Sequence, residues 1–293
     1  MKESPVFVVG MPRSGTTLVS NLINASNKIF IPEETRFFRE LSKSSKLNLD
    51  FRESYFNSNK IYYKSWQLSS SVILKIKGKS SFKDIFEELI KALLNKQNKN
   101  IQWGEKTPIH FMHLNEILKF YPDAKFIHII RDPRDVFNSL ISADWAFAFP
   151  YSRRIDQYNY SADLFLRNPY PQNLYSIKFE ELLKDPVLIT KNIYKFLGLS
   201  YSKKVIENFN KSNNLNFSLK YEPWKKNNIK HIDENKIFKW KNTRNSALNI
   251  YLSKVFSKKL KRLGYDTQSV SFLNIKFYLL SIKVALIKIV FKK

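Results

Sequence analysis

The sequence predicts an α/β fold in three layers, with a central, mainly parallel sheet between helices and with helical insertions. Three short runs rich in β-branched and aromatic residues indicate strands, at 6–9, 125–130 and 174–178. A helix-compatible segment follows each of them, at 16–25, 134–142 and 186–197. The chain of 293 residues is long enough for one large domain with a full core. Because a strand followed by a helix, repeated along a chain, is typical of parallel sheets, this pattern sets the predicted fold class.

More than a hundred residues separate the first two predicted strands, and they contain an amphipathic helix. Its apolar face is formed by Phe82, Ile85, Phe86, Leu89, Ile90 and Leu93. Ser81 precedes this face and Asp84 stands three residues later, a spacing that resembles a capping box at a helix start. The stretch 208–235 is rich in Asn and Lys and indicates a polar loop. Insertions of this kind commonly carry the substrate-selecting parts of α/β proteins.

The composition is strongly basic, with 50 Lys and Arg against 25 Asp and Glu and a net charge of +25. A hydrophobic content of 43% excludes a disordered chain despite that charge. A basic surface favours anionic partners, but zinc-finger spacing, basic heptads and RNA-binding aromatic signatures are absent from the sequence, so we expect no specific nucleic-acid partner. The lack of cysteine excludes disulfides, a thiolate nucleophile and Cys-based metal sites, and it fits a reducing compartment.

We expect one domain over 1–268 and a basic, apolar helix over 269–293. An apolar stripe along this helix is formed by Ile275, Leu279, Ile282, Leu286 and Ile289. Three lysines interrupt the apolar stretch, which disfavours a membrane span and suits a helix at the membrane interface. The alternative is a terminal helix docked on the core or on a second copy of the chain. The first apolar run is too short for a signal peptide, so we expect a cytoplasmic protein whose C-terminal helix is the candidate for peripheral membrane contact.

Residues 10–17, GMPRSGTT, join the first predicted strand to the helix after it. Two glycines let the backbone approach an oxyanion closely, and the helix N-terminus presents free N–H groups. The spacing predicts a P-loop-like fold, but Thr16 occupies the position of the lysine that serves the β- and γ-phosphates of a nucleoside triphosphate. Arg131, not an acidic magnesium ligand, follows the second predicted strand. The loop therefore favours an anion of lower charge that is held without a metal.

A second motif, RDPRDVFNS at 131–139, follows the strand at 125–130. Arg131 offers a planar fork of donors suited to a phosphate, and Ser139 lies on the next predicted helix. Taken alone, the motif could form a surface salt-bridge cluster, which is the commoner role of such Arg and Asp runs.

Together the two motifs resemble the nucleotide-binding segments of sulfotransferases that use 3′-phosphoadenosine 5′-phosphosulfate (PAPS) and release adenosine 3′,5′-bisphosphate (PAP). Residues 32–36, PEETR, and 104–108, GEKTP, resemble segments of the tyrosylprotein sulfotransferase branch. Further similarities extend the resemblance over roughly residues 5–266, at 196–198, 239–240 and 263–266.

The resemblance implies a role for each matching residue in a metal-independent, in-line transfer. Arg13 and Lys106 would stabilise the sulfuryl group and the departing phosphate. The nucleotide would be bound by the following residues: Arg13, Ser14, Gly15, Thr16 and Thr17 at the 5′-phosphate, Arg131 and Ser139 at the 3′-phosphate, and Lys239 as a weaker candidate. Side chains can replace a metal ion here because a sulfuryl group carries less charge than a phosphoryl group.

The acceptor must lose a proton to a base, and by register the resemblance implies that Glu34 is this base. Glu34 could instead be a carboxylate at a helix start, paired with Arg36 or Arg39. Other branches of the family use histidine. His110 and His113 are therefore alternative bases. Glu33 is a third alternative if the register of its segment differs.

The predicted acceptor is a hydroxyl or an amine on a sugar, lipid, small metabolite or peptide. The chain has no cysteine, and we expect no N-terminal anchor, unlike in the tyrosylprotein enzymes. Ala143 stands where they carry an arginine, so protein tyrosine is not singled out. Two other functions stay open. A nucleoside-triphosphate-dependent kinase would require a loop lysine and magnesium ligands. A non-catalytic basic module for nucleic acid or membrane would leave Arg13, Glu34 and Lys106 without a role.

Overall fold

Five parallel strands form the central sheet, in the order β2-β3-β1-β4-β5. Their bounds are β1 Val6–Gly10, β2 Ile29–Phe30, β3 Gln102–Glu105, β4 Lys125–Ile130 and β5 Leu174–Lys178. The structure is a computed structural model, and it describes residues 4–32, 34–42, 49–58, 66, 68–96, 101–141, 151–211, 232–242 and 246–267. The predicted α/β class with a parallel central sheet is confirmed.

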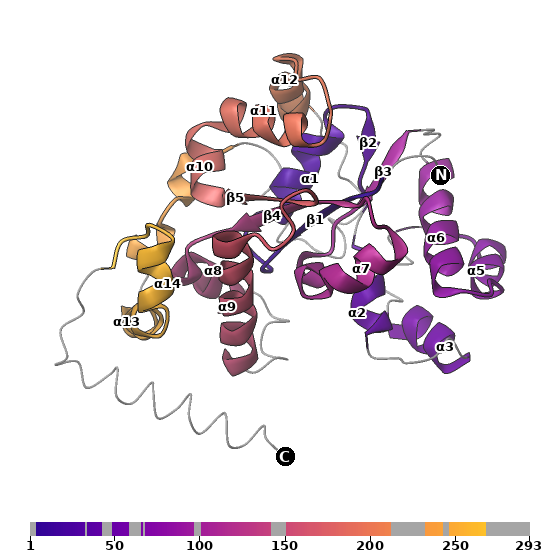
Figure 1. Cartoon of the computed structure of the whole chain (residues 1–293), viewed down its shortest axis with the longest axis horizontal. Coiled ribbons are helices and arrows are strands. Elements are labelled where there is room, and N and C mark those ends of the chain that lie inside the picture. The colour runs from indigo at the N-terminus through magenta and orange to yellow at the C-terminus, as the bar shows by residue number, and fades with distance from the viewer. Residues whose placement is uncertain are drawn as a thin grey trace.

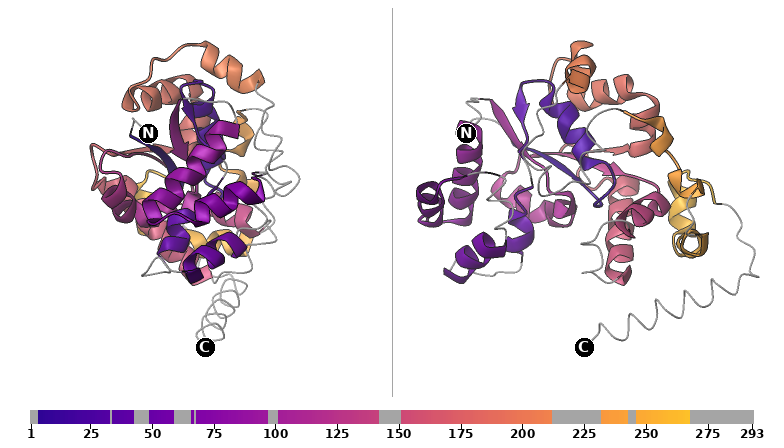
Figure 2. Two further views of the ribbon diagram at one scale, coloured as in Figure 1. Left: turned by 90° about the vertical axis from the view of Figure 1, so that its right-hand side faces the viewer. Right: turned by 180° about the vertical axis from the view of Figure 1, so that it is seen from behind.

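Alternate residues of each strand face opposite layers of helices. In β1, Val6 and Val8 pack against one layer and Phe7 and Val9 against the other. The first layer contains α1 Thr16–Asn24, α10 Phe179–Lys184, α11 Pro186–Phe196 and α12 Lys204–Lys211. The second layer and its extensions contain α2 Phe37–Leu41, α3 Leu49–Ser58, α5 Ser70–Lys77, α6 Phe82–Lys96, η1 Pro108–His113, α7 Leu114–Phe120, α8 Pro133–Ile141, α9 Tyr151–Arg167, α13 Ser246–Val255 and α14 Ser257–Arg262. Figures 1 and 2 show the sheet between these layers.

Several predicted helices are confirmed with small changes of boundary, namely α1, α6, α8 and α11. Ser81 caps α6, because its hydroxyl accepts from the Asp84 N–H at 3.1 Å. The Asp84 carboxylate accepts from the Ser81 hydroxyl at 2.6 Å, where a capping box would have it accept from the Ser81 backbone N–H. The polar loop predicted over 208–235 is wrong at both ends. Helix α12 runs to Lys211, with Val205 and Phe209 buried and Ile206 partly buried against the core. The short 3-10 helix η4 occupies Glu234–Lys236. A second 3-10 helix, η5, follows at Lys239–Asn242.

Two strands were not predicted, β2 and β3. They have two and four residues, too few to give a periodic signal. Strand β3 pairs with β1, with Glu105 opposite Phe7, so the chain passes from β3 into Lys106 at the carboxyl edge of the sheet. This unpredicted strand therefore positions one of the two predicted catalytic cations.

The C-terminal part of the chain extends the second layer. The Phe256 ring, between α13 and α14, lies 5.7 Å from Phe137 of α8 and 4.8 Å from Tyr158 of α9. The predicted helix over 269–293, the domain boundary at 268, Glu33 and Ala143 lie outside the described residues and stay predictions. No helix within the described part of the chain is long and apolar enough to cross a membrane.

Candidate active site

The loop after β1 and the turn after β4 meet at one point of the sheet edge. Strands β1 and β4 are neighbours, and the remaining strands extend to either side of them, with β3 and β2 beyond β1 and β5 beyond β4. Open parallel sheets form their ligand crevices at such a point, outside the carboxyl ends of the strands. The two motifs predicted to bind nucleotide, 10–17 and 131–139, both start there.

Two glycines give the loop after β1 its shape. At Gly10, with a φ of 154°, a Cβ would lie 2.4 Å from the Ile129 carbonyl oxygen. At Gly15, with a φ of 108°, a Cβ would lie 2.5 Å from the Phe179 ring. Both positions need glycine, since the backbone conformation and the space exclude a side chain. The chain can therefore turn tightly and present the first N–H groups of α1 to a ligand.

The polar groups of this loop fit a bound oxyanion. Ser14 is fully buried, and its hydroxyl has no hydrogen-bond partner among the described residues. Within the same ranges, α1 begins at Thr16 without a side-chain cap and without an acidic residue in its first turn. Buried hydroxyls and helix N-termini normally have partners, so an orphaned hydroxyl beside an uncapped helix fits a phosphate-sized anion.

Arg131 connects the two motifs. Its guanidinium donates to the Arg13 carbonyl oxygen at 3.3 Å and to the Lys236 carbonyl oxygen at 2.8 Å. Asp135 lies 3.3 Å away on α8, and the guanidinium carbon lies 4.4 Å from the centre of the Phe179 ring. These contacts fix the fork of donors at the start of α8, next to the loop after β1.

The side chain of Arg13 reaches α8 as well. Its Nε donates to the Ser139 hydroxyl at 2.9 Å, so residues predicted for the two ends of the nucleotide are in direct contact. The backbone of Arg13 has a φ of 75°, a left-handed conformation that is uncommon for a residue with a side chain. Lys239, the weaker nucleotide-binding candidate, is exposed on η5. Arg131 is contacted by the carbonyl oxygen of a different lysine, Lys236.

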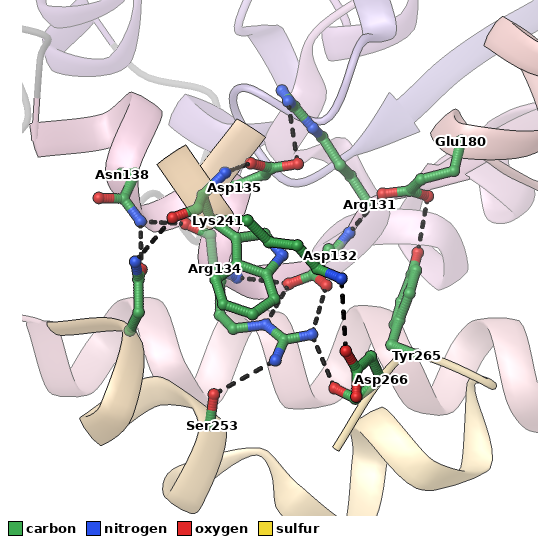
Figure 3. A network of polar contacts seen from close by, with 12 residues as sticks. Arg131, Asp132, Arg134, Asp135, Asn138, Glu180, Lys241, Ser253, Tyr265 and Asp266 are labelled. Atoms are coloured by element: carbon green, nitrogen blue, oxygen red, sulfur yellow. Dashed lines mark hydrogen bonds and ion pairs between the residues drawn. The ribbon is translucent and has the colours of Figure 1, made fainter. Parts of the chain in front are cut away.

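Asp132 and Arg134, which follow Arg131 in the chain, form a fully buried ion pair (Figure 3). Arg134 donates to both Asp132 carboxylate oxygens, at 3.0 and 2.7 Å, and to the Asp266 carbonyl oxygen at 2.9 Å. The Trp240 ring lies 3.8 Å from its guanidinium carbon. Because both charges are fully buried, this part of the motif is not a surface salt-bridge cluster. It attaches the segment 240–266 to α8.

Glu34 and Lys106 meet at the carboxyl edge of the sheet. Lys106 Nζ donates to Glu34 Oε1 at 2.8 Å, and the ammonium is almost fully buried. Arg36 Nε lies 3.8 Å from the other carboxylate oxygen, so the alternative pairing with Arg36 is also present, over a longer distance. The structure thus brings the predicted base next to a predicted catalytic cation.

The two histidines differ in their surroundings. His110 is fully buried, and its Nδ1 lies 2.9 Å from Glu105 Oε2. Burial lowers the pKa of His113 to about 4, and the charges of His110 and Arg39 add to this effect. His113 is therefore uncharged at neutral pH. His110 is held by Glu105, whereas Glu34 contacts the predicted catalytic cation Lys106.

Some contacts of the site could not be found in the sequence. Phe179 and the Lys236 carbonyl both hold Arg131, yet neither belongs to a recognisable motif. The Trp240 backbone N–H donates to Asp135 at 2.7 Å and its ring packs against Arg134, so Trp240 is a buried anchor of the site. Among the described residues, no group of three or more His, Asp or Glu side chains could hold a metal ion.

Comparison with known proteins agrees with this geometry. A model of the sulfotransferase family matches residues 5–203. The protein-tyrosine sulfotransferase of Drosophila melanogaster is 24% identical over 257 residues, which cover 82% of this chain and 47% of that protein. The chain thus spans about half the length of this relative.

Two solved structures show the same fold. A sulfotransferase domain from the curacin biosynthetic pathway has a TM-score of 0.63 at 18% identity and covers 90% of this chain and 98% of its own. A mouse sulfotransferase in complex with PAP has a TM-score of 0.52 at 15% identity and covers 89% of this chain and 85% of its own. With a family model matching more than half of its length, the chain belongs to the sulfotransferase family.

Proposed function

We propose that the chain transfers a sulfuryl group from PAPS to an acceptor hydroxyl or amine, with Glu34 as the general base. The observation that carries this proposal is the 2.8 Å contact between Glu34 and Lys106 at the sheet edge, where β3 and β1 are neighbours. A proton acceptor and a buried cation would then lie after β3, the neighbour of the strand that leads into the loop that fits an oxyanion. The family of the chain makes sulfuryl transfer the reaction that this combination suits.

The nucleotide would occupy the crevice between the loop after β1 and the start of α8. Ser14, Thr16, Thr17 and the N–H groups of α1, with Gly15 at its start, would hold the 5′-phosphate. Arg131 would bind the 3′-phosphate through its fixed fork of donors, and Ser139 would add a hydroxyl. The burial of Ser14 and the contact between Arg131 and the Arg13 carbonyl support this assignment.

In the transfer, the bond between sulfur and the bridging phosphate oxygen breaks while sulfur bonds to the acceptor oxygen or nitrogen. The acceptor proton passes to the Glu34 carboxylate, and the freed electron pair remains on the phosphate of departing PAP. Arg13 and Lys106 would stabilise the charge that develops on that phosphate and on the sulfuryl oxygens. Fixed cations of this kind act mainly through position and electrostatics, as in phosphoryl transfer.

The donor assignment is tested by calorimetric titration with PAP in the absence of magnesium. We expect micromolar binding that is lost in R131A and kept in R167A, a matched control because Arg167 is an exposed arginine paired with Asp163 on α9. A requirement for ATP and magnesium would instead indicate a kinase. Failure of the folded protein to bind PAP would refute the proposal.

The acceptor is sought with sulfur-labelled PAPS and a panel of sugars, lipids, small metabolites and peptides. A tyrosine peptide belongs in the panel because the relative from Drosophila is named a protein-tyrosine sulfotransferase. We expect E34Q to bind PAP normally and to lose most of the transfer to any acceptor found. Full activity of E34Q would reassign the base.

The segment 269–293 is proposed as a peripheral membrane contact of an otherwise cytoplasmic protein, as its sequence pattern indicates. Flotation with anionic liposomes tests this idea by comparing the full chain with a chain that ends at residue 269. Equal binding of the two chains would reject the proposed contact.

A further inference from the structure

We infer that Glu105 is a positioning residue for catalysis: its buried carboxylate fixes Glu34 and Lys106 in register with each other. The inference rests on the proposed function, because it assigns Glu105 a role in placing the proposed base and cation. Glu105 does not touch the reacting groups itself. It acts through Thr35 and Thr107, the residues that directly follow Glu34 and Lys106 in the chain.

Both segments that carry the catalytic pair are hydrogen-bonded to this one carboxylate. Glu105 Oε1 accepts from the Thr35 N–H at 3.0 Å, from the Thr35 hydroxyl at 2.9 Å and from the Thr107 hydroxyl at 2.5 Å. Glu105 Oε2 accepts from the Thr107 N–H at 3.0 Å and lies 2.9 Å from His110 Nδ1. Five donors on two oxygens exhaust the acceptor capacity of a carboxylate. The group therefore has one arrangement, which it imposes on both segments.

The Glu105 carboxylate connects the two segments beyond the point where pairing between β2 and β3 ends. Strands β2 and β3 pair through Ile29 with Gln102 and Phe30 with Trp103, and β2 stops at Phe30. Beyond that point the contacts through Glu105 connect the segment of Glu34 to the end of β3. The Thr107 hydroxyl adds a second link, since it accepts from the Arg36 N–H at 3.0 Å while it donates to Glu105.

Glu105 acts in its ionised form. Burial would raise its pKa, but the charge of His110 and the hydrogen bonds from His110, Thr107 and Thr35 outweigh burial and lower the pKa below its ordinary value. An ionised carboxylate only accepts hydrogen bonds, so all five groups, on Thr35, Thr107 and His110, must donate to it. His110 thereby acquires a role as the donor that completes this arrangement.

The positions of Glu34 and Lys106 relative to each other affect the rate of the proposed transfer. A displacement of about 1 Å in a catalytic group can lower a rate by roughly 100-fold. Loss of one bond from Glu105 frees a backbone segment next to Glu34 or Lys106 without changing either side chain. Nucleotide binding should be spared, because Arg131, Ser14 and the start of α1 make no contact with this carboxylate in the described structure.

The test compares T107V with T107S. Valine keeps the shape of threonine but removes the hydroxyl that links Glu105 to the Arg36 N–H, whereas serine keeps that hydroxyl. Y194F serves as the stability control, since it removes a buried hydrogen bond of 2.7 Å to the Leu22 carbonyl, between α11 and α1. We expect T107V to lower kcat for the conversion of PAPS to PAP by about 10- to 100-fold, with the Kd for PAP changed less than about 2-fold. The kcat values of T107S and Y194F should stay within about 3-fold of that of the unaltered protein.

A second measurement does not depend on activity. Reductive methylation of the whole protein, followed by mass spectrometry of its peptides, reports how fast Lys106 reacts. We expect Lys106 to be labelled faster in T107V and E105Q than in T107S, because its ion pair with Glu34 is loosened. Equal labelling in all variants would overturn the inference even if the unaltered chain transfers sulfuryl groups. Absence of transfer by the unaltered chain, with faster labelling in T107V, would refute the proposed function and leave the positioning role of Glu105 in place.

Discussion

Removal of the Arg134 side chain should destabilise the whole protein, because Arg134 neutralises a charge that has no access to water. Asp132 and Arg134 are both fully buried, and the guanidinium makes two short bonds to the carboxylate, at 2.7 and 3.0 Å. The same guanidinium donates to the Ser253 hydroxyl and to the Asp266 carbonyl. The substitution R134A thus breaks the attachment of the segment 240–266 to α8.

The expected size of the effect follows from this burial. An ion pair at the surface contributes about 0–1 kcal/mol, but loss of one partner from a buried pair costs about 3–5 kcal/mol, because the other charge stays buried. The total stability of a protein is about 5–15 kcal/mol, so R134A should lose a large part of it. The double variant D132N/R134M removes both charges, and we expect it to regain most of the loss.

Equilibrium unfolding in urea measures both variants. The midpoint of R134A should fall strongly at an unchanged slope, and that of D132N/R134M should lie between R134A and the unaltered protein. A loss below about 1 kcal/mol in R134A would refute the reasoning, since that value is typical of an exposed pair. So would a double variant that is no more stable than R134A.

Two further predictions concern the same region. Burial raises the pKa of Glu180 to about 7, despite its bonds from the Asp132 N–H and the Tyr265 hydroxyl, so the folded state holds a proton that the unfolded chain releases near pH 4.5. The free energy of unfolding should therefore fall by about 3 kcal/mol as the pH rises from 4.5 to 7. Urea unfolding of E180Q should show no such fall, and the same pH dependence in E180Q and the unaltered protein would contradict the prediction. At the loop after β1, G15A should weaken PAP binding, because its Cβ would lie 2.5 Å from Phe179, whereas G78A, with 3.5 Å to its nearest atoms, should bind normally. Equal affinities of the two variants in calorimetry would contradict that account.

Local sequence was sufficient where a motif lies within one strand, turn and helix. Residues 10–17 and 131–139 each follow a predicted strand, so their positions at the sheet edge could be predicted without any long-range contact. The parallel order of the strands then brings the two motifs together, as the contact between Arg131 and the Arg13 carbonyl shows. Strands β2 and β3 escaped prediction because their short length gives no periodicity. They are strands only through pairing, β3 with β1 and β2 with β3.

The sequence by itself determined the fold class and the loop that fits an oxyanion, because these depend on residue types in a local pattern. Its resemblance to a known family supplied the candidates Glu34, Arg13, Lys106 and Arg131. Tertiary structure decided how the candidates are held. Glu34 and Lys106 are 72 positions apart, and Arg131 and the Lys236 carbonyl are 105 apart. Neither contact can be predicted from the periodicity of a local segment. A buried charge such as Glu105 or Asp132 acquires its role only when the fold removes water and supplies its donors, which is a property of the assembled core and not of any one segment.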